Sequence, residues 1–168
     1  STVLATDGIA GFTTYQLSVN LGPNAANIYT LFGDREHGPL VLPAAYQVAA
    51  PFGADIMGVN PQFFPINPMS QFDSWITIGI ITGGAGEISS IGIDWARWTA
   101  TTGITSSNGA IFWMSPDDGP AGSAVIAQIT VASGSSGTAV CCLRGRSTGN
   151  TEDWDAYGIE FRYGHVCV

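Results

Sequence analysis

The sequence has 168 residues, with 13 acidic side chains, five arginines and no lysine, which gives a formal net charge of −8. A nucleic-acid-binding surface needs clustered Lys or Arg, so this balance argues against a nucleic-acid partner. No apolar run approaches the roughly 20 residues that a transmembrane helix needs, so we expect no transmembrane segment.

The low charge of the chain indicates that part of its surface is covered. Charged residues make up 11% of the sequence, whereas an average soluble domain has about 25%. Hydrophobic residues reach 45% and the mean hydropathy is +0.23, so the chain is expected to fold into a compact domain. Another copy or a partner protein is the simplest cover for a weakly charged exterior.

The first residues contain neither a basic stretch nor a long apolar segment. They do not resemble a signal peptide, and we interpret the chain as mature and processed. A secreted protein, or one in an organelle lumen, is the expectation that follows.

Alternation of apolar and polar residues predicts antiparallel strands along most of the chain. Residues 15–21 and 28–32 alternate on either side of Gly22-Pro23-Asn24 and are expected to form a hairpin. About eight short strands with intervening turns predict one domain over residues 1–168, an all-β antiparallel sandwich of jelly-roll or immunoglobulin-like architecture. The six further strands are expected at 75–81, 89–95, 110–114, 124–131, 138–144 and 158–165.

Two of these regions are weakly alike. Gln16-Leu17-Ser18-Val19 matches Gln128-Ile129-Thr130-Val131, and Leu31 matches Leu143, all at an offset of 112 residues. Two hairpins that obey the same turn rules look similar by chance, which we favour over an ancient duplication.

Residues 33–72, here called the excursion, differ in composition from the rest. They hold six of the nine prolines, interleaved with aromatic and methionine side chains. Long loops without secondary structure are uncommon in compact domains and are often functional. We expect the excursion either to pack over one sheet or to present an apolar surface to a partner. The candidate partner-binding residues are Tyr46, Phe52, Met57, Phe63, Phe64 and Met69.

Two acidic loops form a candidate calcium site. Asp117 and Asp118 lie in a proline-flanked turn, and Asp153 and Asp155 flank a tryptophan. Calcium takes six to eight oxygen ligands, which these loops could supply if they met at one end of the sandwich. Neither loop has the spacing of an EF-hand, and ordinary polar turns are the alternative.

Aromatic and arginine side chains form a candidate carbohydrate site. Trp98 and Trp154 flank turns and are expected to be exposed, where an indole face could stack on a sugar ring. Arg144 and Arg146 lie two residues apart on one strand, so both should project from the same face and could bind a carboxylate. A carbohydrate-binding module, with or without calcium, is therefore the alternative function.

The three cysteines leave two alternatives open. Cys141 and Cys142 are adjacent on a strand and point to opposite faces, so they cannot easily share a partner. One disulfide is expected to join Cys142 to Cys167; three reduced, buried thiols are the alternative. A zinc site is not expected, because adjacent cysteines lack the usual spacer.

The cluster Asp34-Arg35-Glu36-His37 offers the only residues that suggest a hydrolase, with His37 as a base beside Asp34 or Glu36. A charged strand end at the surface explains the same residues. Motifs of nucleophilic catalysis and of phosphate binding are absent from the sequence. We therefore expect a non-enzymatic structural or adhesive subunit without a cofactor, which assembles with itself or a partner through apolar surfaces of low charge.

Overall fold

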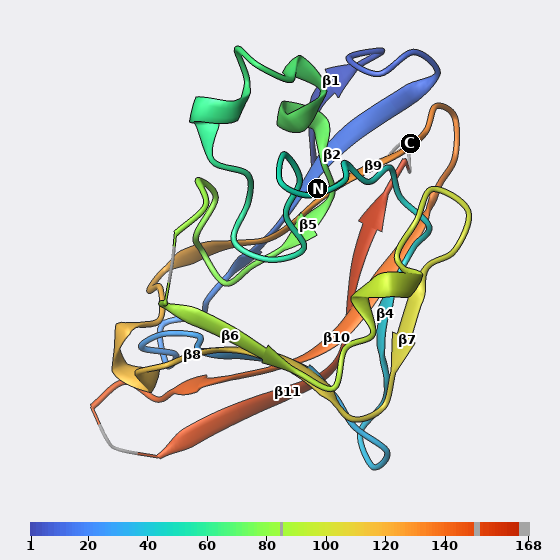
Figure 1. Ribbon diagram of the computed structural model, residues 1–168. Helices are drawn as coiled ribbons and strands as arrows, with labels where there is room; N and C mark the ends of the chain where they lie inside the picture. Colours follow the sequence, from blue (N-terminus) through green and yellow to red (C-terminus); the bar gives the residue numbers. More distant parts are fainter. Residues whose placement is uncertain (85, 150–151, 165–168) are drawn as a thin grey trace.

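The computed structural model describes residues 1–84, 86–149 and 152–164. Eleven strands form two antiparallel sheets that face each other, and the expected all-β sandwich is confirmed (Figure 1). In this described part, no helix is long and apolar enough to cross a membrane.

The small sheet has four strands and the large sheet has seven. The small sheet runs in the order β1 (Thr2–Thr6), β2 (Phe12–Asn20), β9 (Ser123–Ala132) and β5 (Trp75–Ile76). The large sheet contains β3 (Thr30–Gly33), β4 (Leu40–Leu42), β6 (Ile88–Ile91), β7 (Ile104–Ser106), β8 (Gly109–Trp113), β10 (Gly137–Arg146) and β11 (Asp153–Tyr163). Short 3₁₀ turns occur at η1 (Pro61–Phe63), η2 (Pro68–Phe72), η3 (Trp95–Arg97) and η4 (Pro116–Asp118).

The hydrophobic core lies between the two sheets. Leu17 and Ile129 of the small sheet, and Leu31 and Leu143 of the large sheet, are at most 2% exposed. Their positions follow from alternation, because every second residue of a strand points to the same face. Each such side chain contributes about 1.5–3 kcal/mol by leaving water.

The predicted hairpin between 15–21 and 28–32 is wrong. β2 pairs with β1 and β9, whereas β3 pairs with β8 and β10 in the other sheet. The weakly similar segments are instead direct neighbours: Gln16 lies opposite Gln128, and Leu31 opposite Leu143. The weakly similar segments therefore pair antiparallel with each other at the centre of each sheet.

The large sheet bends where two of its strands are interrupted. β3 and β4 both pair with β10, on the side opposite to β11, and the turn 34–38 separates them. β8 pairs with β3 and β7 pairs with β4, so this neighbouring strand is interrupted as well. Gly33 lies at this bend, where a Cβ atom would collide with Leu40 N, so only glycine fits. Figure 1 shows the sheet turning between the β6–β8 strands and the β4–β7 strands.

Part of the excursion lies beside the small sheet, whereas its residues Leu40–Leu42 form β4 of the large sheet. Ile76 N of β5 donates to Asp55 O, and Met57 N donates to Ile76 O, so residues 55–57 close the free edge of β5. Tyr46 N donates to Thr130 O of β9. These backbone bonds replace the strand that β5 lacks on its outer side.

Asp73, which follows the excursion directly, binds two backbone N–H groups of the excursion. Its carboxylate is 0% exposed and accepts hydrogen bonds from Val48 N at 2.6 Å and Ala54 N at 2.7 Å. Burial raises the pKa of Asp73 to about 7, although the bonds from Ala54 N and Val48 N lower it. Gly53 lies in the same turn, where a Cβ atom would collide with Val48 O.

We expect the stability of the protein to fall as pH rises from about 4 to about 7, because the pKa of Asp73 is raised in the folded state. Between these values the folded state binds more protons than the unfolded state, and a raised carboxyl pKa therefore lowers stability as pH rises. Each unit of pKa difference corresponds to about 1.4 kcal/mol. Asp73→Asn is expected to flatten this slope in urea denaturation measured across the pH range.

The matched control is Asp118→Asn, on the exposed side of η4, which should leave the slope as in the wild type. The same slope in the wild type and in Asp73→Asn would contradict the role of Asp73.

Candidate functional site

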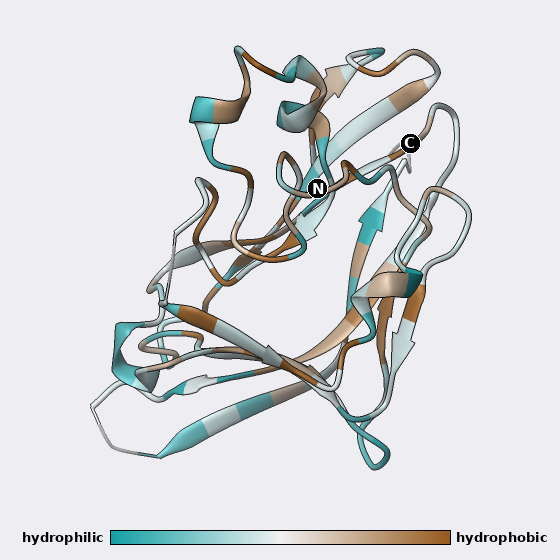
Figure 2. Cartoon of the chain, in the orientation of Figure 1, coloured by the Kyte–Doolittle hydropathy of each residue, from teal (hydrophilic) through white to brown (hydrophobic). Residues whose placement is uncertain are grey.

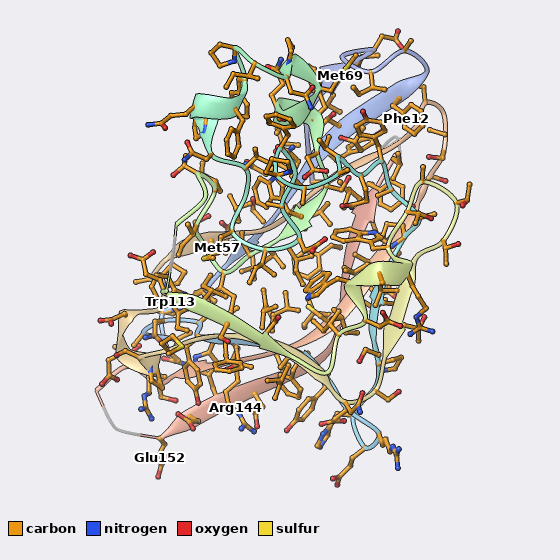
Figure 3. The ribbon with its side chains drawn as sticks, in the orientation of Figure 1. Phe12, Met57, Met69, Trp113, Arg144 and Glu152 are labelled. Atoms are coloured by element: carbon orange, nitrogen blue, oxygen red, sulfur yellow. The ribbon has the colours of Figure 1, made fainter. Side chains whose placement is uncertain are left out.

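Two arginines and three carboxylates from the predicted ligand sites meet on the outer face of the large sheet. Arg144 and Arg146 are two residues apart on β10 and point to one face, as expected. The register of β11 places Asp155 opposite Arg144 and Asp153 opposite Arg146. Figure 3 shows Arg144 on the side of β10 and β11 that faces away from the small sheet. We call these four residues, together with Asp117, the arginine row.

Arg144 forms a bidentate ion pair. Its Nε lies 2.6 Å from Asp155 Oδ1 and its Nη2 lies 2.9 Å from Asp155 Oδ2. The guanidinium carbon lies 5.7 Å from the centre of the Phe32 ring. Hydrogen bonding to Arg144 lowers the pKa of Asp155, and Tyr157 Oη also donates to Asp155 Oδ2 at 3.1 Å. Two parallel N–H···O bonds fix the geometry of such a pair.

Arg146 joins the two acidic loops. Its Nη1 lies 2.9 Å from Asp153 Oδ1, and its Nε lies 3.3 Å from Asp117 Oδ1. The guanidinium carbon lies 5.6 Å from the centre of the Tyr29 ring. The loops therefore meet as the calcium hypothesis required, but an arginine occupies the meeting point. Over the residues that the structure describes, no group of three or more His, Cys, Asp or Glu could hold a metal ion, and Asp118 is not among these ion pairs. Calcium binding stays an untested prediction.

The expectation that Trp98 is exposed is wrong. The side chain is 3% exposed, and its Nε1 donates to Pro43 O at 2.9 Å. Trp154 is half-buried; its Nε1 donates to Asn27 O at 3.2 Å, and its indole packs where a Cβ atom at Gly145 would lie. Both rings are used for packing inside the domain, because a tryptophan beside a turn can face either side of the sheet. The carbohydrate alternative loses Trp98 as a stacking residue and otherwise stays an untested prediction.

His37 belongs to a structured turn between β3 and β4. Its Nδ1 lies 2.8 Å from Asp34 Oδ2, and its ring stacks on Tyr157 of β11 with centres 3.9 Å apart. The hydrogen bond to Asp34 raises the pKa of His37 and lowers that of Asp34. These contacts hold the turn against β11, while Arg35 and Glu36 are exposed. The hydrolase hypothesis stays an untested prediction.

Cys141 and Cys142 are both buried, and they form no disulfide within the part of the chain that the structure describes. Cys141 faces the core, and burial raises the pKa of its thiol. Cys142 Sγ lies 4.0 Å from His37 O and 3.9 Å from Gly38 O. Cys167 lies outside the described residues, so the Cys142–Cys167 disulfide stays a prediction.

Most of the proposed partner-binding residues of the excursion are half-buried. Phe52 and Phe63 pack edge to face with ring centres 5.5 Å apart, and Tyr46 packs against Phe12 at 5.8 Å. Met57 packs against the core, and Phe64 is half-buried. Met69 alone is largely exposed, at 47%. In Figure 3 it lies at the outer end of the excursion, far from Arg144.

The sequence patterns did not single out several apolar side chains that are largely exposed in the structure, among them Met114 and Ile91, at 66% and 59%. Ile66, in the excursion, is 68% exposed. Val3 and Leu4, on β1, are 55% and 48% exposed. The alternation of β1 was too short to predict a strand, although an uncharged run of five residues was a visible signal. Figure 2 shows the contrast with η4 and the start of β11, where hydrophilic residues gather.

No protein-family model, curated protein or solved structure matches this chain. Its function is therefore argued from its own surfaces.

We expect Asp155→Asn to lower the free energy of unfolding at neutral pH by about 1 kcal/mol, because it removes a partly exposed but bidentate ion pair. Arg144 lowers the pKa of Asp155, so this stabilisation is present above the unfolded-state pKa and is lost as pH falls through the folded-state value. The difference between wild type and variant in urea denaturation should therefore disappear in acid.

Glu160→Gln is the matched control, since Glu160 pairs with Arg162 at 3.0 Å and both side chains are about half exposed or more. Glu160→Gln should lower the free energy of unfolding by less than Asp155→Asn does. An equal effect of the two variants, or a difference that persists in acid, would show that the arginine row does not stabilise the sheet.

Proposed function

We propose that this protein is a non-enzymatic structural or adhesive subunit that assembles with itself or with a partner protein through apolar surfaces of low charge. The observation that carries the proposal is β1, an uncharged strand at the edge of the small sheet with Val3 and Leu4 exposed. Large apolar side chains in solvent at an open sheet edge are typical of contact surfaces.

The distribution of charge supports the proposal. Four of the five arginines form ion pairs with carboxylates of the same chain. Few cations therefore remain to bind phosphate or an acidic partner. The outer face of the large sheet is held together by its own ion pairs, which leaves the uncharged surfaces as the places where binding is least costly.

A second set of exposed apolar side chains extends the candidate surface. Ile66 and Met69 lie on the outer side of the excursion. η2, which contains Met69, is adjacent to the turn after β1, because a Cβ atom at Gly8 would meet the Phe72 ring. The excursion and the β1 end of the small sheet are thus neighbours.

The mass of the native particle tests this proposal. Light scattering behind a sizing column should give a mass above the 17.5 kDa of one chain, and EDTA should not change it. A mass of one chain at every concentration would remove self-assembly and leave only a different partner protein. A change of mass with EDTA would instead support the calcium-dependent alternative.

A further inference from the structure

The edges of the two sheets are protected to different degrees. An edge strand carries unpaired N–H and C=O groups, and proteins blunt it by cover, charge or shortness. The edge of β5 is covered by residues 55–57. β11 is lined by charged side chains, and β7 and β6 are only three and four residues long.

β1 is the longest of the uncharged edge strands, since β6 and β7 also carry no charge but have only four and three residues. β1 pairs with β2 on one side only, and none of the strands in the described ranges pairs with its other side. Its five residues are Thr2-Val3-Leu4-Ala5-Thr6, and four of them are exposed. The free backbone groups of such a strand have the geometry to accept another extended strand.

The sequence of β1 is nearly the same in both directions. If two copies pair antiparallel around a two-fold axis at Leu4, threonine lies opposite threonine, and Val3 lies opposite Ala5 of the second copy. Thr–Thr and apolar pairs are favourable across antiparallel strands, and this pairing places no charged residues opposite each other. A two-fold interface requires such a self-complementary surface.

We infer that β1 pairs antiparallel with β1 of a second copy, which joins two small sheets into one sheet of eight strands, four from each copy. The inference rests on the proposed function and names its partner and surface. Growth stops at the dimer, because the other edge of the small sheet, at β5, is covered by the excursion. The result is a closed dimer and not a fibre.

A β-bulge limits the strength of this contact. The register with β2 shifts between Val3 and Ala5, so Leu4 is the extra residue. Bulges increase the local twist and shorten the run that can pair. The dimer is therefore small and reversible, and its population depends on protein concentration.

Sedimentation analysis over a concentration series tests the inference. The wild type should shift from one chain to two as concentration rises. Leu4→Lys brings two ammonium groups together at the axis and should weaken dimerisation about tenfold or more, equivalent to about 1.4 kcal/mol or more. Val3→Lys is a second variant at a more exposed position and should weaken it as well. Both side chains are about half exposed, so urea denaturation should show an intact fold.

Met114→Lys is the matched control, a lysine at an exposed apolar position directly after β8 of the large sheet, outside the candidate surface. It should dimerise as the wild type does. Assembly that survives Leu4→Lys and Val3→Lys but is lost in Ile66→Lys would overturn the β1 dimer while leaving the proposed function intact. A wild type with the mass of one chain throughout would overturn both the β1 dimer and self-assembly.

Discussion

Buried polar groups beneath the excursion determine which surfaces of this protein remain open. Gln128 of β9 donates from Nε2 to Asp73 O at 2.7 Å and to Gln71 O at 3.0 Å, and Ser74 Oγ accepts from Thr130 N at 2.9 Å. Asp73 and Ser74 are 0% exposed. Buried polar groups are costly unless paired, so this network has one favourable arrangement. The excursion is thereby fixed over β9 and β5, and the opposite edge of the small sheet stays free.

The same network explains why an apolar, proline-rich segment is not simply a binding loop. Its aromatic residues pack against each other and against β2, as Phe52 with Phe63 and Tyr46 with Phe12 show. The segment supplies a missing edge strand and part of the cover of a four-stranded sheet. Ser70 Oγ is buried without a protein hydrogen-bond partner, an exception within the described residues. Only a few side chains, such as Ile66 and Met69, are left for other contacts.

Local patterns in the sequence predicted the class of fold because alternation is a local property. They placed β2, β8, β9 and β10 correctly to within a few residues but missed β1, β4 and β7, which have only three to five residues. The pairing of the strands was not predictable from local patterns. Gln16 lies opposite Gln128, and this contact between distant parts of the sequence depends on how the whole core packs. The exposure of side chains beside turns could not be predicted from the sequence either, as the buried Trp98 shows. The meeting of the loops that carry Asp117 and Asp153 was only a condition of the calcium hypothesis, and the position of Arg146 between them was not predicted.

The central claim is that the small sheet has one closed edge, at β5, and one open edge, at β1. Residue-resolved amide hydrogen exchange at low and high protein concentration tests it most directly. The account predicts that the amides of Ile76 and Met57, which bond across the closed edge, are protected at both concentrations. It predicts that the amides of β1 that do not bond to β2 exchange quickly when the protein is dilute and slow down when it is concentrated. Exchange in β1 that does not depend on concentration, or fast exchange at Ile76 and Met57, would contradict the account.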